Sequence, residues 1–273
     1  MPLRLKIIML CVLFAGLSYL LGSINFAILT TKKVTGKDIR SFGSGNAGMT
    51  NVMRTAGFVP GLITLLGDFG KAALAVVLGK YLLTDLLLML VPASVYPPGF
   101  TYDYAAALAP IYGGTICGLF CVIGHCYPIY FGFKGGKGVA TCIGMITVLD
   151  WRIALILIGV FAIVFLVSRI ISLSSVTAAV CYPIATYILY SERNDFLPVA
   201  NYIKIANQSG YRPFFMSLVW FETIAATVFA LILIINHKEN IARLIRGEEK
   251  KLSLKKPKKA EKPEITDNPN NSL

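Results

Sequence analysis

A glycine-rich segment between residues 38 and 57 carries side chains that could bind a phosphate. Gly43, Gly45 and Gly48 alternate there with polar residues. Its hydroxyl, amide and guanidinium groups belong to Ser44, Asn46, Thr50, Asn51 and Arg54. Small residues let backbone N–H groups converge on one point, so this combination suits an anion with several oxygen atoms. A glycine-rich turn, capped by Ser and Asn before the next helix, is the simpler alternative.

A second glycine-rich segment holds two lysines among three glycines, at Lys134, Gly135, Gly136, Lys137 and Gly138. Its spacing matches neither a Walker P-loop nor the glycine pattern of a dinucleotide-binding fold. The pattern instead predicts a helix that begins at about Gly138, with an anion held at its positive end by backbone N–H groups and lysine charge. The alternative is a cationic anchor whose lysines extend to the membrane surface.

Other polar side chains lie near the ends of apolar segments. His125 is a candidate general base, although a single histidine in such a place is often only interfacial. Ser172 belongs to a serine-rich segment, for which helix capping is a sufficient explanation. His237 and Asn240 are three residues apart, which places them on one face of a predicted amphipathic helix on the membrane.

Long apolar runs must position these residues. The chain of 273 residues is 56% hydrophobic and 15% charged, with a mean hydropathy of +0.68. These values predict an all-α membrane protein with several spans rather than a soluble domain. The fourth to sixth of the seven expected spans are short for a bilayer, and merging the fourth and fifth is the main alternative. The expected spans cover residues 7–29, 58–80, 105–127, 138–150, 153–168, 176–190 and 214–236.

Two ionisable residues lie within the second expected span. Asp68 and Lys71 are three residues apart, so their side chains share one helical face. Charged groups inside a membrane are costly unless they are paired. We expect these two residues to pair and to have a supporting rather than a catalytic role.

The distribution of basic residues predicts the orientation in the membrane. Seven spans place the two termini on opposite sides. Both glycine-rich loops share one side with the C-terminus, and that side carries most of the Lys and Arg residues. By the positive-inside rule it is cytoplasmic, and the N-terminus is outside. Residues 1–249 are expected to form the membrane domain, and residues 250–273 a basic, disordered tail.

Four segments together resemble one enzyme family. GSGNAGMTN, GHCYPIYFGFKGGKGVAT, SLSS and HKENIARL follow the order of the motifs in bacterial acyl-phosphate:glycerol-3-phosphate acyltransferases. The resemblance covers about residues 22–247, nearly all of the membrane domain. It implies a seven-span enzyme of the cytoplasmic membrane with an external N-terminus. It also implies transfer of a fatty acyl group from acyl phosphate to the 1-hydroxyl of glycerol 3-phosphate, giving lysophosphatidic acid in the first acylation of bacterial phospholipid synthesis.

The resemblance implies a reaction on the cytoplasmic face, with acyl phosphate, glycerol 3-phosphate and the lipid bilayer as partners. Direct acyl transfer is expected, because the sequence shows no evident base and orienting group for an acyl-Ser or acyl-Cys intermediate. No metal, other cofactor or nucleic acid is expected. The residues expected at the reacting groups are His125, Ser44, Lys137 and Asn240. Those expected to bind the two phosphates are Asn46, Thr50, Asn51, Arg54, Lys134, Gly135, Gly136, Gly138, Ser172 and His237.

The sequence does not identify the proton acceptor, and it leaves a transporter and a lipid-binding scaffold as alternative functions. The attacking hydroxyl gives its proton either to His125 or to a phosphate oxygen of the donor. A transporter of phosphate or an organophosphate would also use cationic loops, but transporters usually have repeated halves, which this sequence lacks. A lipid-binding scaffold would use the basic tail and leave His125, His237 and Asn240 without a role.

Overall fold

A computed structural model describes residues 2–90, 102–191 and 218–251. The secondary structure within these ranges is helical, as the all-α prediction requires. Six helical segments in the described ranges are long and apolar enough to cross a membrane. Most of the predicted basic tail, from residue 252 onward, lies outside the described residues.

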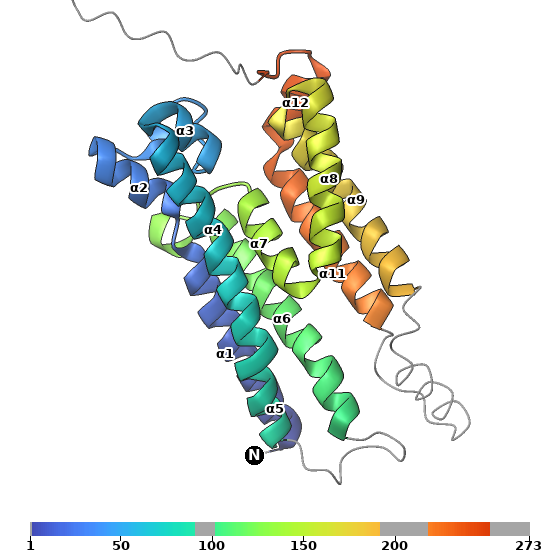
Figure 1. Cartoon of the computed structure of the whole chain (residues 1–273). Helices are drawn as coiled ribbons and strands as arrows, with labels where there is room; N and C mark the ends of the chain where they lie inside the picture. The colour runs from blue at the N-terminus through green and yellow to red at the C-terminus, as the bar shows by residue number, and fades with distance from the viewer. Residues whose placement is uncertain (1, 91–101, 192–217, 252–273) are drawn as a thin grey trace, which may run out of the picture.

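Long helices run side by side along the molecule in two groups (Figure 1). The first group consists of α1 (Leu3–Ser23), α4 (Phe58–Leu78), α5 (Thr84–Leu90) and α6 (Tyr102–Cys126). A π-helical turn at Gly79–Leu83 joins α4 to α5. The second group consists of α8 (Trp151–Ser168), α9 (Ile171–Ser191) and α11 (Leu218–Asn236). Between the groups lies α7 (Val139–Leu149), which contacts α4, α6 and α8.

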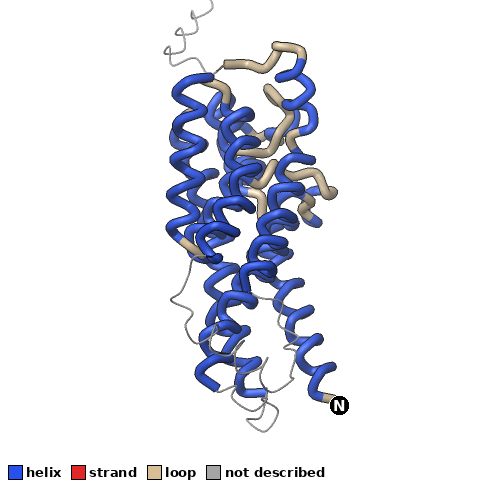
Figure 2. Tube along the Cα trace, turned by 90° about the vertical axis from the view of Figure 1, so that its right-hand side faces the viewer, coloured by secondary structure: helices blue, strands red, loops and turns tan. Residues whose placement is uncertain are grey.

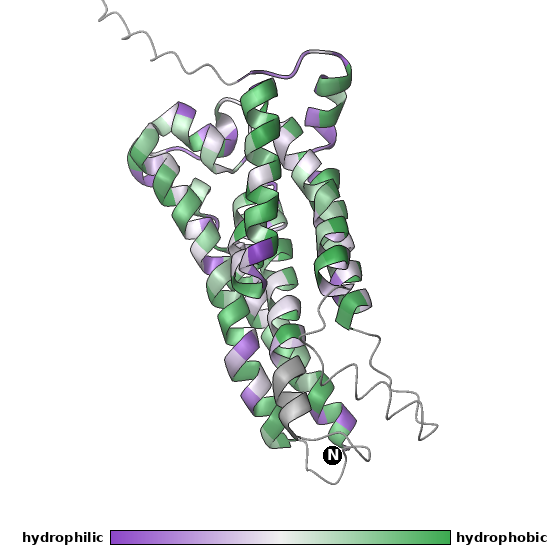
Figure 3. Ribbon diagram, turned by 45° about the vertical axis from the view of Figure 1, so that its right-hand side comes forward, coloured by the Kyte–Doolittle hydropathy of each residue, from purple (hydrophilic) through white to green (hydrophobic). Residues whose placement is uncertain are grey.

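The outward faces of the long helices are apolar (Figure 3). On α8, for example, Leu166 and Val167 are 63% and 85% exposed. Apolar surface of this extent is unfavourable in water but is solvated by lipid tails. The long helices therefore present the surface expected of a membrane domain.

Small residues allow the closest helix contacts. A Cβ atom at Gly22 of α1 would overlap the backbone carbonyl group of Cys121 in α6. A Cβ atom at Gly124 of α6 would similarly overlap the carbonyl of Tyr19 in α1. Helices in a membrane associate largely through such close packing, because the hydrophobic effect does not drive their association in lipid. The pair α1–α6 therefore holds the end of α6, and the loop that follows it, in a fixed place.

The short helices α2 (Phe26–Thr35), α3 (Met49–Ala56) and α12 (Lys238–Ile245) lie at the end of the molecule away from the N-terminus (Figure 1). Most of the described loop residues gather at the same end (Figure 2). Both glycine-rich segments belong to this end, since one precedes α3 and the other precedes α7. The polar residues singled out in the sequence are therefore brought to one region.

Three of the expected span boundaries were wrong. The first expected span, residues 7–29, is interrupted because α1 ends at Ser23, and the Asn25 side chain caps α2 by accepting a hydrogen bond from the Ile28 N–H at 3.1 Å. The second expected span, residues 58–80, ends too early, because its helical segment continues to Leu90. The sixth, residues 176–190, begins earlier, at Ile171. Ser172 therefore lies in the first turn of α9 and not in a loop.

The fourth and fifth expected spans are separate helices. Asp150 between them has an extended backbone, and its side chain accepts a hydrogen bond from the Arg152 N–H at 3.0 Å, which caps α8. The chain reverses there, so α7 and α8 are antiparallel (Figure 1). Because α7 has 11 residues and α8 has 18, α8 extends about 10 Å beyond the start of α7. The glycine loop before α7 is consequently recessed below the end of α8.

Candidate active site

A large cavity opens among the short helices and continues between α7, α8, α9 and α11. Its volume is about 1040 Å³. The polar part of its lining includes Ser44, Asn46, Thr50, Asn51, Arg54, Asp68, His125, Lys137, Ser172, Ser175, His237, Asn240, Arg243, Glu249 and Lys250. The apolar part includes Ile143, Ile146, Leu157, Phe161, Tyr182, Phe229 and Leu233. A polar mouth joined to an apolar interior suits a ligand with a charged group and a long apolar chain.

The first glycine-rich loop is organised by Asn51, a buried residue of α3. Its side-chain N–H groups donate to the carbonyl oxygens of Phe42 at 2.9 Å and Asn46 at 3.1 Å. Its side-chain oxygen accepts from the Ser44 N–H at 3.3 Å. The amide predicted to bind substrate is thus occupied by the loop backbone, and Asn51 has a supporting role. A Cβ at Gly43, which has a φ of 56°, would overlap that same amide oxygen.

The remaining donors of the first loop face the cavity. Ser44, Asn46, Thr50 and Arg54 line it as predicted. Neither the Arg54 guanidinium nor the Ser44 hydroxyl has a hydrogen-bonded or ionic partner among the residues that the structure describes. Unpaired donors at the rim of a cavity are available to an anion.

The second glycine-rich loop leads into α7 as predicted, with Gly138 at the N-cap and the Cys142 N–H donating to the Gly138 carbonyl at 2.7 Å. Two of its N–H groups are already used, however. The Gly135 N–H donates to the Cys126 carbonyl at 3.1 Å, and the Gly136 N–H donates to the His125 carbonyl at 3.2 Å. These bonds fold the loop against the end of α6, so Gly135 and Gly136 shape the site rather than bind a phosphate through these N–H groups.

The two lysines of this loop lie in different environments. Lys137 lines the cavity and donates a hydrogen bond to the side-chain oxygen of Asn240. Burial lowers the pKa of Lys137, and the nearby Glu249 carboxylate partly opposes that effect. Lys134 is exposed and does not line the cavity. Its carbonyl oxygen instead accepts a hydrogen bond from Arg40 at 3.1 Å, so the phosphate-binding role predicted for Lys134 has no support in the geometry.

Asp68 and Lys71 pair as predicted, and His125 joins them. The Lys71 Nζ atom lies 2.9 Å from Asp68 Oδ1 and 3.0 Å from His125 Nδ1. Lys71 also donates to the Ile24 carbonyl at 2.6 Å, at the break between α1 and α2. All three ionisable side chains are buried, as mutual pairing in a membrane requires.

His125 lies behind the second glycine loop. It borders the cavity but is only 3% exposed. A Cβ at Gly136 would overlap the His125 Nε2 atom, so the ring lies directly against this glycine. With Nδ1 bound by Lys71 and Nε2 against Gly136, the ring supports the loop and is poorly placed to reach a substrate hydroxyl.

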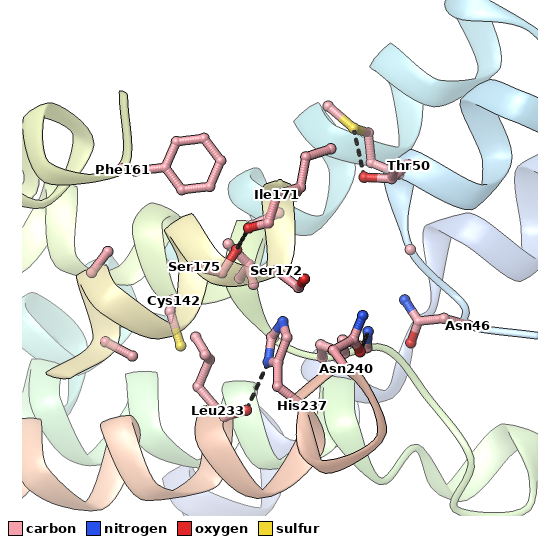
Figure 4. Close-up of a pocket in the computed structure, with 18 of the residues that line it drawn as sticks. Asn46, Thr50, Cys142, Phe161, Ile171, Ser172, Ser175, Leu233, His237 and Asn240 are labelled. Atoms are coloured by element: carbon pink, nitrogen blue, oxygen red, sulfur yellow. Dashed lines mark hydrogen bonds between the residues drawn. The ribbon is translucent and has the colours of Figure 1, made fainter. Parts of the chain in front are cut away.

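The third side of the site comes from α9 and α12. Figure 4 shows His237 and Asn240 next to each other near Ser172, with Asn46 approaching Asn240 from the first loop. The amphipathic helix predicted after the last span is confirmed as α12, with His237 at its N-cap. His237 and Asn240 both line the cavity, as their spacing predicted.

His237 has a defined hydrogen-bonding direction. Its Nδ1 lies 2.8 Å from the carbonyl oxygen of Leu233, which can only accept, so Nδ1 carries the hydrogen in the neutral ring (Figure 4). The Nε2 atom is then an acceptor. Burial lowers the pKa of His237 to about 4, so the ring is neutral at physiological pH.

Sequence reasoning missed three charged residues of the cavity lining, Arg243, Glu249 and Lys250. Arg243 is three residues after Asn240, so the face shared by His237 and Asn240 could have predicted it. Glu249 follows the end of α12, and no periodicity indicates that its carboxylate returns to the cavity. Its hydrogen bonds to Ser172 and Asn240 measure 2.7 and 2.6 Å.

Comparison with known proteins agrees with this geometry. The family model described as glycerol-3-phosphate acyltransferase matches residues 12–247. A glycerol-3-phosphate acyltransferase from Nitrosomonas eutropha is 35% identical over 244 residues, which cover 89% of this chain and 98% of the relative. Another from Prochlorococcus marinus is 34% identical over 236 residues, covering 86% of this chain and 94% of the relative.

Two solved structures of PlsY (YgiH), an integral membrane glycerol 3-phosphate acyltransferase, are also similar. Its glycerol 3-phosphate form is 31% identical with a TM-score of 0.62, covering 89% of this chain and 96% of that one. Its lysophosphatidic acid form is 30% identical with a TM-score of 0.60, covering 89% and 95%. The chain therefore belongs to the glycerol-3-phosphate acyltransferase family of integral membrane enzymes.

Proposed function

We propose that the enzyme transfers a fatty acyl group from acyl phosphate to the 1-hydroxyl of glycerol 3-phosphate. The hydroxyl oxygen bonds to the acyl carbonyl carbon, and the bond from that carbon to the bridging phosphate oxygen breaks. The products are lysophosphatidic acid and inorganic phosphate. The observation that carries the proposal is the division of the cavity into a cationic mouth and an apolar interior. Both substrates have a phosphate, and the donor also has a long apolar chain.

The polar part of the cavity has two groups of hydrogen-bond donors, one from the first loop and α7 and one from α9 and α12, which suit the two phosphates. We assign the acyl phosphate to the first loop and Lys137, because Ser44, Asn46 and Arg54 line the cavity there. Among the described residues, the Ser44 hydroxyl and the Arg54 guanidinium have no partner. The chain of the acyl phosphate would enter the apolar interior between α7, α8, α9 and α11. We assign glycerol 3-phosphate to Ser172, His237, Asn240 and Arg243. The enzyme then acts mainly by positioning two reactants and stabilising charge, since acyl phosphate is already activated.

The attacking hydroxyl has three candidate proton acceptors. His125 is disfavoured because Lys71 binds its Nδ1 and Gly136 covers its Nε2. His237 offers Nε2, but its pKa of about 4 makes it a weak base. Phosphate monoesters have a second pKa of about 6, so the phosphate of the donor is the stronger base. The proton therefore passes to the departing phosphate in this proposal, and no covalent acyl-enzyme forms.

The proposed orientation places the cavity on the cytoplasmic face of a bacterial inner membrane. Six segments would cross the bilayer, namely α1, α4 with α5, α6, α8, α9 and α11, and α7 would enter it as a seventh. At about 16 Å, α7 crosses only half of a hydrocarbon core of about 30 Å. The basic residues Lys32, Lys33 and Lys37 lie at the cavity end, which by the positive-inside rule is cytoplasmic and leaves the N-terminus outside.

A direct assay tests the proposed reaction. Purified enzyme receives acyl phosphate and isotopically labelled glycerol 3-phosphate, and labelled lysophosphatidic acid is expected together with one phosphate per acyl group. Absence of that product, combined with phosphate flux across liposomes that contain the protein, would favour the transporter instead. Acyl-CoA serves as a control donor and is expected to give no product, because it lacks the acyl-linked phosphate that the first loop is proposed to bind.

A further inference from the structure

A carboxylate lies within the anion-binding mouth of the cavity. Glu249 Oε1 accepts hydrogen bonds from the Ser172 hydroxyl at 2.7 Å and from the Asn240 amide at 2.6 Å. Glu249 Oε2 accepts one from Arg243 Nε at 2.7 Å, within an ion pair. One side chain thus contacts three of the four residues assigned to glycerol 3-phosphate.

The chain turns back after α12 to bring Glu249 to this place. Gly247 has a φ of 72°, a left-handed conformation that glycine adopts without strain. The Gly247 N–H donates to the Leu244 carbonyl at 3.1 Å, and the Glu248 N–H donates to the Arg243 carbonyl at 2.8 Å. This helix end reverses the chain toward the start of α9, where Ser172 lies.

The Glu249 carboxylate also fixes the direction of the Asn240 amide. A carboxylate is an acceptor only, so the Asn240 NH₂ group faces it. The Asn240 oxygen then faces Lys137, from which it accepts a hydrogen bond. The reverse amide orientation would place the NH₂ group against the Lys137 ammonium, where both groups are donors. A continuous chain of hydrogen bonds therefore runs from Glu249 through Asn240 to Lys137.

We propose that Glu249 is a positioning residue for acyl transfer, which holds Ser172 and Arg243 together and orients Asn240 toward Lys137. The inference rests on the proposed function of these residues in phosphate binding. Burial alone would raise the pKa of Glu249, but its hydrogen bonds from Ser172, Asn240 and Arg243 lower it below its usual value. The side chain is therefore ionised at neutral pH, as its role requires.

A competing role for Glu249, in which it blocks the phosphate site, predicts a different effect of substitution on KM. If the carboxylate merely occupied the phosphate site of an empty enzyme, it would compete with glycerol 3-phosphate, and its removal would lower KM. As a positioning residue, its removal misplaces the donors and raises KM or lowers kcat. A misplacement of about 1 Å costs on the order of 100-fold in rate, so a loss of about 10- to 100-fold in kcat/KM is expected for Glu249→Ala.

The experiment compares Glu249→Ala with Glu248→Ala under the acyl phosphate assay. Glu248 is the matched control, because it pairs with Arg246 at 2.7 Å in an exposed ion pair and does not line the cavity. Wild-type enzyme is measured in parallel, so failure of the proposed function appears as an inactive wild type. Glu248→Ala is expected to keep its activity within about twofold.

Rescue by an added carboxylate separates positioning from general stability. Formate fits the space that Glu249→Ala leaves and is expected to restore at least a fifth of the wild-type kcat/KM, whereas chloride at equal ionic strength is not. Glu249→Gln keeps one acceptor oxygen, so its kcat/KM is expected to fall between those of wild type and Glu249→Ala. This variant replaces Glu249→Ala in the comparison if the alanine variant does not fold. Unchanged or improved kcat/KM in either variant, or a loss that formate does not reverse, would overturn the proposal.

Discussion

Replacement of Lys137 by methionine tests the site most sharply, because the same loop contains a matched control. Lys137→Met removes the ammonium group but keeps a side chain of similar length. Lys134→Met makes the identical change three residues earlier, on an exposed side chain outside the cavity. The lost charge lies where the phosphates are proposed to bind in one variant, and at the protein surface in the other.

The expected magnitude follows from the contacts of each lysine. A hydrogen bond to a charged group contributes about 1.5–3 kcal/mol, so one lost contact to phosphate costs about 10- to 150-fold. Stabilisation of charge in the transition state raises this to about 100- to 1000-fold in kcat/KM for Lys137→Met. Exposed charges contribute under about 1 kcal/mol, so Lys134→Met is expected to stay within about fivefold of wild type.

The assay measures kcat/KM for both substrates, with thermal unfolding as a check that each variant is folded. Loss of activity in Lys137→Met alone supports the assignment of the cavity. Equal losses in both variants would show that general loop charge, and not contact with phosphate, is what matters. A Lys137→Met enzyme within fivefold of wild type would refute the role of this lysine.

Three further predictions concern other parts of the site. Gly136→Ala is expected to lower activity at least tenfold and to destabilise the fold by about 1–3 kcal/mol, because the new Cβ overlaps His125. Gly16→Ala, which has open space around it, is the control for both the activity assay and the unfolding measurement. Ala230→Phe fills part of the apolar interior, so competition between acyl phosphates of different length should shift toward the shorter chain. The pKa of His237 is lower in the folded protein than in the unfolded chain, so protonation favours the unfolded chain. The free energy of unfolding should therefore fall by at most about 3 kcal/mol as the pH decreases from about 6.5 toward about 4. Unfolding of His237→Asn between pH 7.5 and pH 5 is expected to lack that decrease, and an unchanged pH dependence would contradict the buried neutral ring.

The sequence predicted the elements of the site better than the role of each side chain. Apolar runs and charge placement indicated the long helices, and helical spacing indicated that His237 and Asn240 share a face. The start of α7 at Val139, directly after Gly138, also followed from the glycine pattern. These features depend on local periodicity and capping, which short stretches of sequence encode.

The partners of individual polar groups could not be predicted in the same way. Asn51 and Ser44 are polar residues of the same segment. The Asn51 amide is occupied by loop carbonyls, whereas the Ser44 hydroxyl has no partner in the part of the chain that the structure describes. Which of Lys134 and Lys137 faces the cavity depends on how Arg40 and α6 hold the loop. Such contacts join segments far apart in sequence, so spacing within one motif does not reveal them.

Long-range contacts also account for the two largest changes of role. His125 was a candidate base as a histidine at the end of an apolar segment, but its partners come from α4 and the ring lies against Gly136. Glu249 had no predicted role at the end of the membrane domain, and the reversal of the chain at Gly247 brings it to Ser172. In both cases tertiary packing decides where the side chain lies and which groups it contacts.

Direct acyl transfer is the central claim, and a single-turnover experiment tests it most directly. Excess enzyme is mixed with labelled acyl phosphate in the absence of glycerol 3-phosphate, and the acceptor is added afterwards. With direct transfer, the protein carries no label before the addition, and lysophosphatidic acid and phosphate then appear together in equal amounts. Phosphate release before the acceptor is added, with the acyl label bound to the protein, would contradict direct transfer.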